Sequence, residues 1–123
     1  MSAKLKSLTR ETILNCDDLK KEVVPVPEWG GTVTVTTMTG FQRDAFEQSI
    51  IETKGKSVTT NMENIRSKLC AHTIVDEDGK RLFSDADIRD LGGKSAAALD
   101  RIFAVAQRLN GLRDEDVEGL AKN

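Results

Sequence analysis

The stretch VVPVPEWGGTVTVTTMTGFQ, Val23–Gln42, decides how the chain folds. Within it, Thr32–Met38 alternates threonine with valine, which is the pattern of a strand with one buried face. Glu22–Pro27 is rich in valine and is joined to that strand by the turn Glu28–Gly31. We therefore predict a β-hairpin, whose first strand lies at a sheet edge because Pro25 cannot donate to the ladder.

Helical signals follow the hairpin. Thr39–Gln42 has the spacing of a capping box, which predicts a helix directly after the second strand. The face that this helix would bury consists of Phe41, Ala45, Phe46, Ser49 and Ile50. Thr60–Glu63 repeats the capping pattern, and Lys54–Thr59 between the two helices is expected to be an exposed loop. The inner face of the second helix would hold Met62, Ile65, Leu69 and Thr73.

The longest predicted helix runs from Ser95 to Asn110, with Gly111 placed to cap its end. Its apolar positions recur at helical spacing: Leu99, Ile102, Phe103, Ala106 and Leu109. A last short helix is expected at Asp114–Ala121, with Val117 and Leu120 on its apolar side.

One more short helix is predicted near the N-terminus, between Leu5 and Leu19, starting near Thr9. Together these elements predict a mainly α (α+β) fold, a helical domain with an N-terminal β-hairpin and a second short hairpin as an option. The length of 123 residues is that of one domain, residues 1–123.

The acidic stretch after Ile74 resembles a calcium loop because carboxylates crowd around Gly79. An EF-hand needs an oxygen ligand at its first position and a bidentate glutamate at its twelfth. With Gly79 in the sixth position, the first is Ile74, which has no ligand atom, and the twelfth is Asp85. The sequence favours a tight turn between two short strands, followed by a helix Asp85–Leu91 that is capped by Ser84.

Two Gly-Lys-Ser triplets, Gly55–Ser57 and Gly93–Ser95, invite comparison with a phosphate-binding loop. That motif needs another glycine five residues before its second glycine, and the two positions hold Ile50 and Ile88. Both triplets are better interpreted as a linker and a helix start.

His72 is the one histidine of the chain and follows Cys70 by two residues. On a helix that spacing points the side chains to opposite sides, which argues against a nucleophilic pair. We expect His72 at or near the surface, and Cys16 and Cys70 as small buried hydrophobic residues. A solvated helix face is expected for the remaining carboxylates: Asp85, Asp87 and Asp90. No catalytic, cofactor-binding or metal-binding residue is predicted.

The net charge and the length of the apolar runs indicate the class of partner. A net charge of −2 provides no field for nucleic acid, and no apolar run is long enough to span a membrane. The residues alone therefore indicate a helix-rich binding domain without a cofactor.

Several strings resemble the tail assembly chaperones of long-tailed, siphovirus-type bacteriophages and prophages. The resemblance extends from about Leu8 to the C-terminus and rests on Val26–Gly31, Met38–Glu47, Ile74–Ser84, Lys94–Phe103 and Gln107–Gly111. It implies a protein of the host cytoplasm that coats the tape measure protein, keeps it soluble during tail tube assembly and is absent from the mature virion. It also implies a homo-oligomer, and a longer form made by ribosomal frameshifting that recruits the tail tube protein. Ala121–Asn123 can be encoded with the slippery heptamer A-AAA-AAC.

Candidate protein-binding residues come from this sequence and not from the family. Trp29 is either a partly exposed interface anchor or a cover for the open end of the core. Val117 and Leu120 would dock either on their own domain or, as we expect, on a neighbouring copy. The alternative function is a structural head–tail connector or tail-completion protein, and a small enzyme is a third class.

Overall fold

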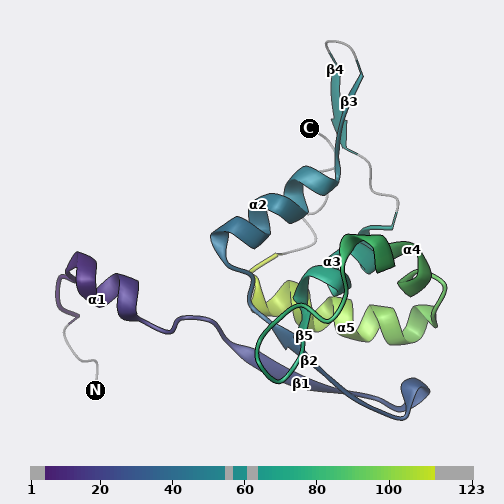
Figure 1. The fold of residues 1–123 in the computed structure, drawn as a ribbon, viewed down its shortest axis with the longest axis horizontal. Helices are drawn as coiled ribbons and strands as arrows, with labels where there is room; N and C mark the ends of the chain where they lie inside the picture. The colour runs from purple at the N-terminus through teal and green to yellow at the C-terminus, as the bar shows by residue number, and fades with distance from the viewer. Residues whose placement is uncertain (1–4, 55–56, 61–63, 113–123) are drawn as a thin grey trace.

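The computed structural model describes residues 5–54, 57–60 and 64–112 (Figure 1). The elements are α1 (Arg10–Asn15), β1 (Lys21–Val26), η1 (Pro27–Trp29), β2 (Gly31–Thr36), α2 (Gly40–Ser49), β3 (Ile51–Lys54), β4 (Ser57–Thr60), α3 (Ile65–Thr73), β5 (Ile74–Val75), η2 (Asp85–Asp87), α4 (Ile88–Leu91) and α5 (Ala96–Leu109). The mainly α (α+β) prediction is confirmed.

The predicted hairpin is the centre of a three-stranded antiparallel sheet in the order β1-β2-β5. Val24 lies opposite Val33, and Val26 and Val35 share their face of the hairpin, whereas Val23 lies on the other face. α3 and α5 cover the first of these faces (Figure 1). β1 is an edge strand, as Pro25 predicted.

The helix α5 supplies most of the covering layer, and its predicted bounds are confirmed to within one residue at each end. Its N-cap is Ser95, whose Oγ accepts from the backbone N–H of Ala98. The buried residues of this helix are Ala98, Leu99, Ile102 and Ala106. At roughly 25 cal/mol for each Å² of apolar surface, their burial against the sheet is a main source of stability.

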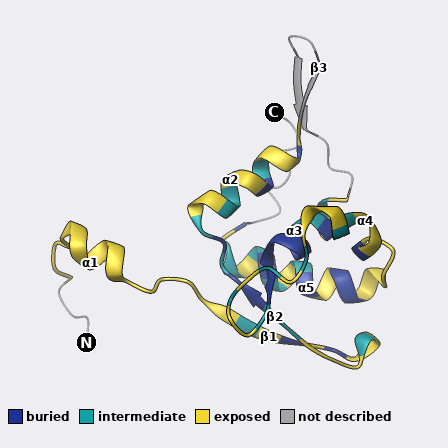
Figure 2. Ribbon diagram, viewed as in Figure 1, coloured by how far each residue is buried: buried dark blue, intermediate teal, exposed yellow. Residues whose placement is uncertain are grey.

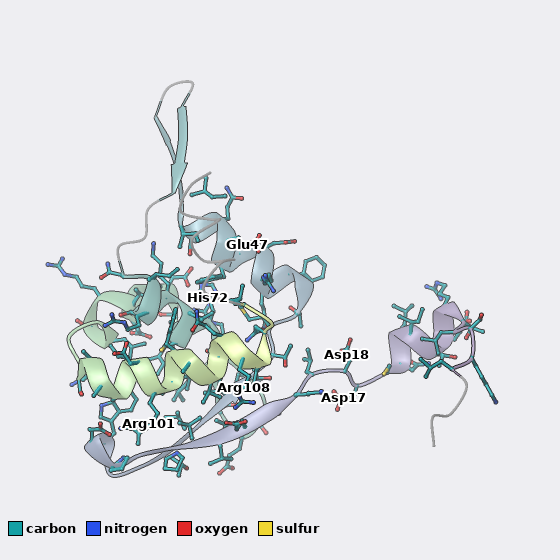
Figure 3. The ribbon with its side chains drawn as sticks, turned by 180° about the vertical axis from the view of Figure 1, so that it is seen from behind. Asp17, Asp18, Glu47, His72, Arg101 and Arg108 are labelled. Atoms are coloured by element: carbon teal, nitrogen blue, oxygen red, sulfur yellow. The ribbon has the colours of Figure 1, made fainter. Side chains whose placement is uncertain are left out.

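Two arginines tie α5 to the hairpin (Figure 3). Arg101 donates two hydrogen bonds to the carboxylate of Glu28, over 2.8 and 2.9 Å. Arg108 donates to both oxygens of Glu22, over 2.6 and 2.7 Å. The Arg101 pair is bidentate and so fixes orientation as well as distance, whereas Arg108 reaches both oxygens from the single atom Nη2. The hairpin is thus held along the helix at two points.

The capping box of α2 is confirmed, because Thr39 and Gln42 exchange both hydrogen bonds. The predicted buried face is right for Phe46 and Ile50 and wrong for Phe41, which is 90% exposed. Two further members of the predicted face are also exposed: Ala45 and Ser49. α2 packs against α3, and its buried residues Phe46 and Ile50 lie in its second half and at its C-terminal end.

The start of α3 differs from the prediction. Thr60 belongs to β4, and the N-cap is Asn64, with a left-handed φ of 62°. Met62, which was expected on the inner face, lies outside the described residues. Leu69 and Thr73 are buried as predicted.

The region between α2 and α3 was predicted to be a loop over Lys54–Thr59, and this was wrong. β3 and β4 pair as an antiparallel hairpin that projects from the end of α2 (Figure 1). The expected C-terminal helix at Asp114–Ala121 lies outside the described residues.

The acidic stretch forms a tight turn, as predicted. Oδ1 of Asp76 accepts from the backbone N–H groups of Asp78 and Lys80, over 2.8 and 3.0 Å. Gly79 takes a φ of 82°, which glycine adopts without strain. The second hairpin is short, with β5 on one side and a single bridge from Val75 to Arg81. The carboxylate of Asp76 therefore stabilises the backbone of the turn.

Candidate protein-binding site

Trp29 lies at the tip of the first hairpin, in the single turn η1. Pro27 begins the turn, and Gly30 ends it with a φ of 75°. The ion pair between the neighbouring Glu28 and Arg101 holds the turn against α5. Trp29 is half-buried and packs against the core. Its position is therefore fixed by the turn on one side and by the core on the other.

A hollow of about 490 Å³ opens beside this tryptophan. Its apolar part consists of Trp29, Leu82, Phe83 and Leu91, and its charged rim consists of Asp87, Asp90 and Lys94. We call this hollow the Trp29 pocket. Leu82 is 53% exposed, so the pocket presents apolar surface that this chain does not cover.

Local structure explains why these side chains meet. Leu82 and Phe83, which were predicted to form a short strand, form a bend instead. The backbone N–H of Leu82 donates to the Ile74 carbonyl over 3.0 Å, which holds this bend beside the sheet. Asp87 completes a capping box with Ser84, whose backbone N–H donates to it over 2.9 Å. The tight turn after α4 brings Lys94 to the rim, where its backbone N–H donates to Leu91.

Sequence reasoning singled out only one part of this pocket. For Trp29 the two alternatives combine, because the ring both packs on the core and lines an open hollow. Leu82 and Phe83 were assigned to a strand and not to a site; the signal available was two adjacent large apolar residues beside a polar turn. Val117 and Leu120 lie outside the described residues.

The expectation of a solvated acidic face holds for Asp85 and Asp90, which are exposed, whereas Asp87 is partly buried. Asp87 is the capping residue already described, and Asp90 stands on the rim of the Trp29 pocket. Asp85 accepts from Arg81 over 3.0 Å and is 71% exposed. Among the described residues, no group of three His, Cys, Asp or Glu side chains could hold a metal ion.

His72 was expected near the surface, and the structure contradicts this (Figure 3). Its side chain is 3% exposed, packed edge-on to the ring of Phe46 with 5.7 Å between centroids. Nε2 has no hydrogen-bond partner and lies 3.6 Å from Oδ1 of Asp85. Burial, and next to it the charge of Arg81, lowers the pKa of His72, while Asp85 opposes the shift.

The two cysteines differ. Cys70 is buried, as predicted, and burial raises its pKa to about 12. Cys16 is exposed, so the prediction of burial was wrong for it. It lies in a segment that packs on no part of the described core.

Comparison with known families decides what kind of protein carries this pocket. A family model described as phage tail assembly chaperone matches residues 9–123. The chain belongs to the phage tail assembly chaperone family. No curated protein matches the chain. No described helix of this tail assembly chaperone is long and apolar enough to cross a membrane.

The fold of this tail assembly chaperone also has a solved counterpart, titled "Structure of bacteriophage HK97 tail assembly chaperone". The TM-score is 0.56 at 15% sequence identity, covering 85% of this chain and 95% of that chain. At this identity the likeness shows a shared fold. The similarity covers nearly all of the counterpart, so its fold is represented here almost complete.

Proposed function

We propose that this chain is a non-catalytic chaperone of the host cytoplasm that binds the tape measure protein. It keeps that protein soluble while the tail tube assembles and then leaves before the virion is complete. Membership of the tail assembly chaperone family supports a role in tail assembly. The observation that carries the binding role is the open apolar Trp29 pocket.

The pocket suits one apolar side chain projecting from a partner helix. Trp29 and Phe83 supply flat aromatic surface, and tryptophan is enriched among the residues that dominate binding energy once a partner excludes water from them. The rim carboxylates Asp87 and Asp90 favour a basic residue next to that side chain. Each contact is small, so many copies along one elongated partner would bind through avidity and still be displaced one at a time.

Trp29 makes a direct test simple because it is the only tryptophan in the chain. Purified fragments of the tape measure protein are titrated while tryptophan fluorescence is recorded. We expect a saturable change, and a roughly tenfold weaker affinity for Leu82→Asp, which loses the contact of one exposed leucine. The matched control is Val23→Asp, an exposed residue on the uncovered face of the sheet, which should bind normally.

Equal binding by Leu82→Asp and the parent protein would contradict the pocket assignment. A complete absence of binding by any tape measure fragment would contradict the partner. Mass spectrometry of purified particles separates the chaperone from a head–tail connector or tail-completion protein, because only a structural protein remains in the virion.

The longer form and the self-contact stay predictions of the same function. Sequencing the DNA past the codon of Asn123 tests whether a frame in the −1 register follows a slippery heptamer. The expected helix with Val117 and Leu120 would contribute to a homo-oligomer, and removal of residues 114–123 should then lower the mass in light scattering. An unchanged mass would exclude that contact.

A further inference from the structure

The chain begins with an exposed segment, Leu5–Lys20, which we call the N-terminal arm (Figure 2). Every residue of the arm is exposed, including Leu8, Ile13 and Leu14 at 66, 55 and 64%. Figure 1 shows that the arm extends away from the sheet, and no residue of α1 is buried.

The arm nevertheless carries a well-formed helix start. Oγ1 of Thr9 accepts from the backbone N–H of Thr12 over 3.2 Å, as an N-cap does. Leu8 and Ile13 occupy the two positions of a hydrophobic staple around that cap. A helix of six residues is marginal in water by itself, so α1 needs a surface that covers its apolar side.

We propose that the arm of one copy places Leu14 in the Trp29 pocket of a second copy while no tail partner is bound. The arm is a short helix with unpartnered leucines, and the pocket is an open apolar hollow of about 490 Å³. The contact would cover apolar surface on both sides that the single chain leaves in water.

The course of the arm favours a second copy over the same chain. From Lys20, β1 carries the chain roughly 20 Å in the opposite direction before η1 and Trp29 begin. The arm and η1 therefore lie at opposite ends of the hairpin, and in this structure the arm leads away from its own chain's sheet (Figure 1).

The charges around the two surfaces also match. Arg10 and Glu11 precede Leu14 by four and three residues, so both lie on its side of the helix. Their mutual ion pair is long, at 3.6 Å, and both side chains are more than two-thirds exposed. The pocket rim offers Asp90 and Lys94 as partners of the opposite sign.

The contact joins different surfaces of the two copies, so it is head-to-tail and can continue from copy to copy. It also caps the pocket until a partner displaces the arm. This second consequence rests on the proposed function, because it assumes that the tape measure protein enters the same pocket. The arm contact itself does not depend on that assumption.

Cys16 offers a direct test, because it lies two residues after Leu14 and is exposed, whereas Cys70 is buried. The parent chain is mixed with a mass-tagged copy that carries Cys16→Ser and Lys94→Cys, under mild oxidation. We expect a disulfide-linked heterodimer. Adding Leu14→Asp to the parent chain should lower its yield roughly tenfold, as expected for the loss of one buried leucine.

Two matched controls accompany the mixture. Asn15→Asp adds the same charge beside Leu14 and should leave the yield unchanged. A tagged copy with Cys16→Ser and Arg89→Cys places the thiol on α4, away from the Trp29 pocket, and should cross-link little. Equal yields from the Lys94→Cys and Arg89→Cys copies, or insensitivity to Leu14→Asp, would overturn the proposal.

A chain with both Cys16 and Lys94→Cys tests the same-chain alternative. At high dilution an internal disulfide, seen as an oxidised monomer, would show that the arm reaches its own pocket and would overturn the exchange between copies. These measurements need no tail protein, so their failure leaves the proposed function intact. A tape measure fragment that changes Trp29 fluorescence without reducing the cross-link would overturn only the inference that a partner displaces the arm from the pocket.

Discussion

Asn110, which follows the last residue of α5, is hydrogen-bonded to Met38 in the link between β2 and α2, with the Met38 backbone N–H donating to Oδ1 over 2.6 Å. The same side chain donates through Nδ2 to the carbonyls of Ala106 and Thr36, over 2.9 and 3.4 Å. Arg43 of α2 donates to the Asn110 carbonyl over 3.0 Å. One asparagine therefore joins the sheet, α2 and α5.

Replacing Asn110 by alanine should destabilise the fold. The Met38 N–H would lose its acceptor in a buried setting, since Met38 is 6% exposed. We expect a loss of about 1–3 kcal/mol in the free energy of unfolding, measured by urea denaturation. Asn110→Asp keeps an acceptor for Met38 and should cost less. Equal stability of Asn110→Ala and the parent chain would contradict the role of this side chain.

His72 should make stability fall in mild acid. Its pKa in the folded state lies below the ordinary value of 6.5, so the unfolded chain binds the proton more readily. Stability should therefore be level above pH 6.5 and should decrease below it until the folded-state pKa is reached. Urea unfolding at pH 8, 6.5 and 5.5 measures this decrease.

The control for this pH effect is His72→Leu, which removes the one histidine and its unpartnered Nε2. The variant should flatten the dependence between pH 6.5 and 5.5. It should also be at least as stable as the parent chain at pH 8, because it buries no polar atom without a partner. If the free energy of unfolding of the variant fell as steeply between pH 6.5 and 5.5 as that of the parent chain, groups other than His72 would cause the pH dependence.

The turn that carries Trp29 should loosen in stronger acid. The hydrogen bonds from Arg101 lower the pKa of Glu28 to about 2, from an ordinary 4.5. The contribution of this pair is thus complete above pH 4.5 and is lost as the pH falls toward 2. Tryptophan fluorescence should follow that loss, and Glu28→Gln should show the loosened signal already at pH 7. A variant spectrum equal to the parent spectrum would contradict the link.

The two cysteines should react very differently. One thiol per folded chain should react with a disulfide reagent at pH 8, because Cys16 is exposed whereas Cys70 is buried with its pKa raised to about 12. Two thiols should react after unfolding in urea. Cys16→Ser should abolish the fast reaction, and a remaining fast thiol in that variant would show that Cys70 is accessible.

The elements predicted best were those with a strong local signal. The alternation in Thr32–Met38 predicts a strand with one buried face, and the helical spacing in Ser95–Asn110 predicts a helix with one buried face. In both cases the sequence period agrees with the burial seen in the structure. The capping box at Thr39 also predicted its helix correctly, because its two hydrogen bonds join residues that are close in the sequence.

The errors arose where tertiary packing decides. α3 is surrounded by the sheet, α2, α4 and α5, so polar residues such as His72 and Ser67 are buried beside its apolar ones. No single-face pattern can indicate such a helix. β3 and β4 contain β-branched residues around Gly55, which was a strand signal, but the Gly-Lys-Ser triplet was interpreted as a loop.

The candidate site could be predicted only in part because it is assembled from separate segments. Trp29 stood out as a lone tryptophan followed by two glycines. Its neighbours Leu82 and Asp90 come from the second turn and from α4, and nothing local places them together. The contact between such segments depends on how the layers pack, which local periodicity does not specify.

The position of Pro25 has a consequence for how copies can associate. The β1–β2 ladder continues past Pro25 to Val26, so the proline nitrogen faces the open edge of the sheet and offers no hydrogen there. An added strand would meet a missing donor near the end of β1, and the opposite edge is the two-residue β5. This sheet is therefore a poor template for fibre growth.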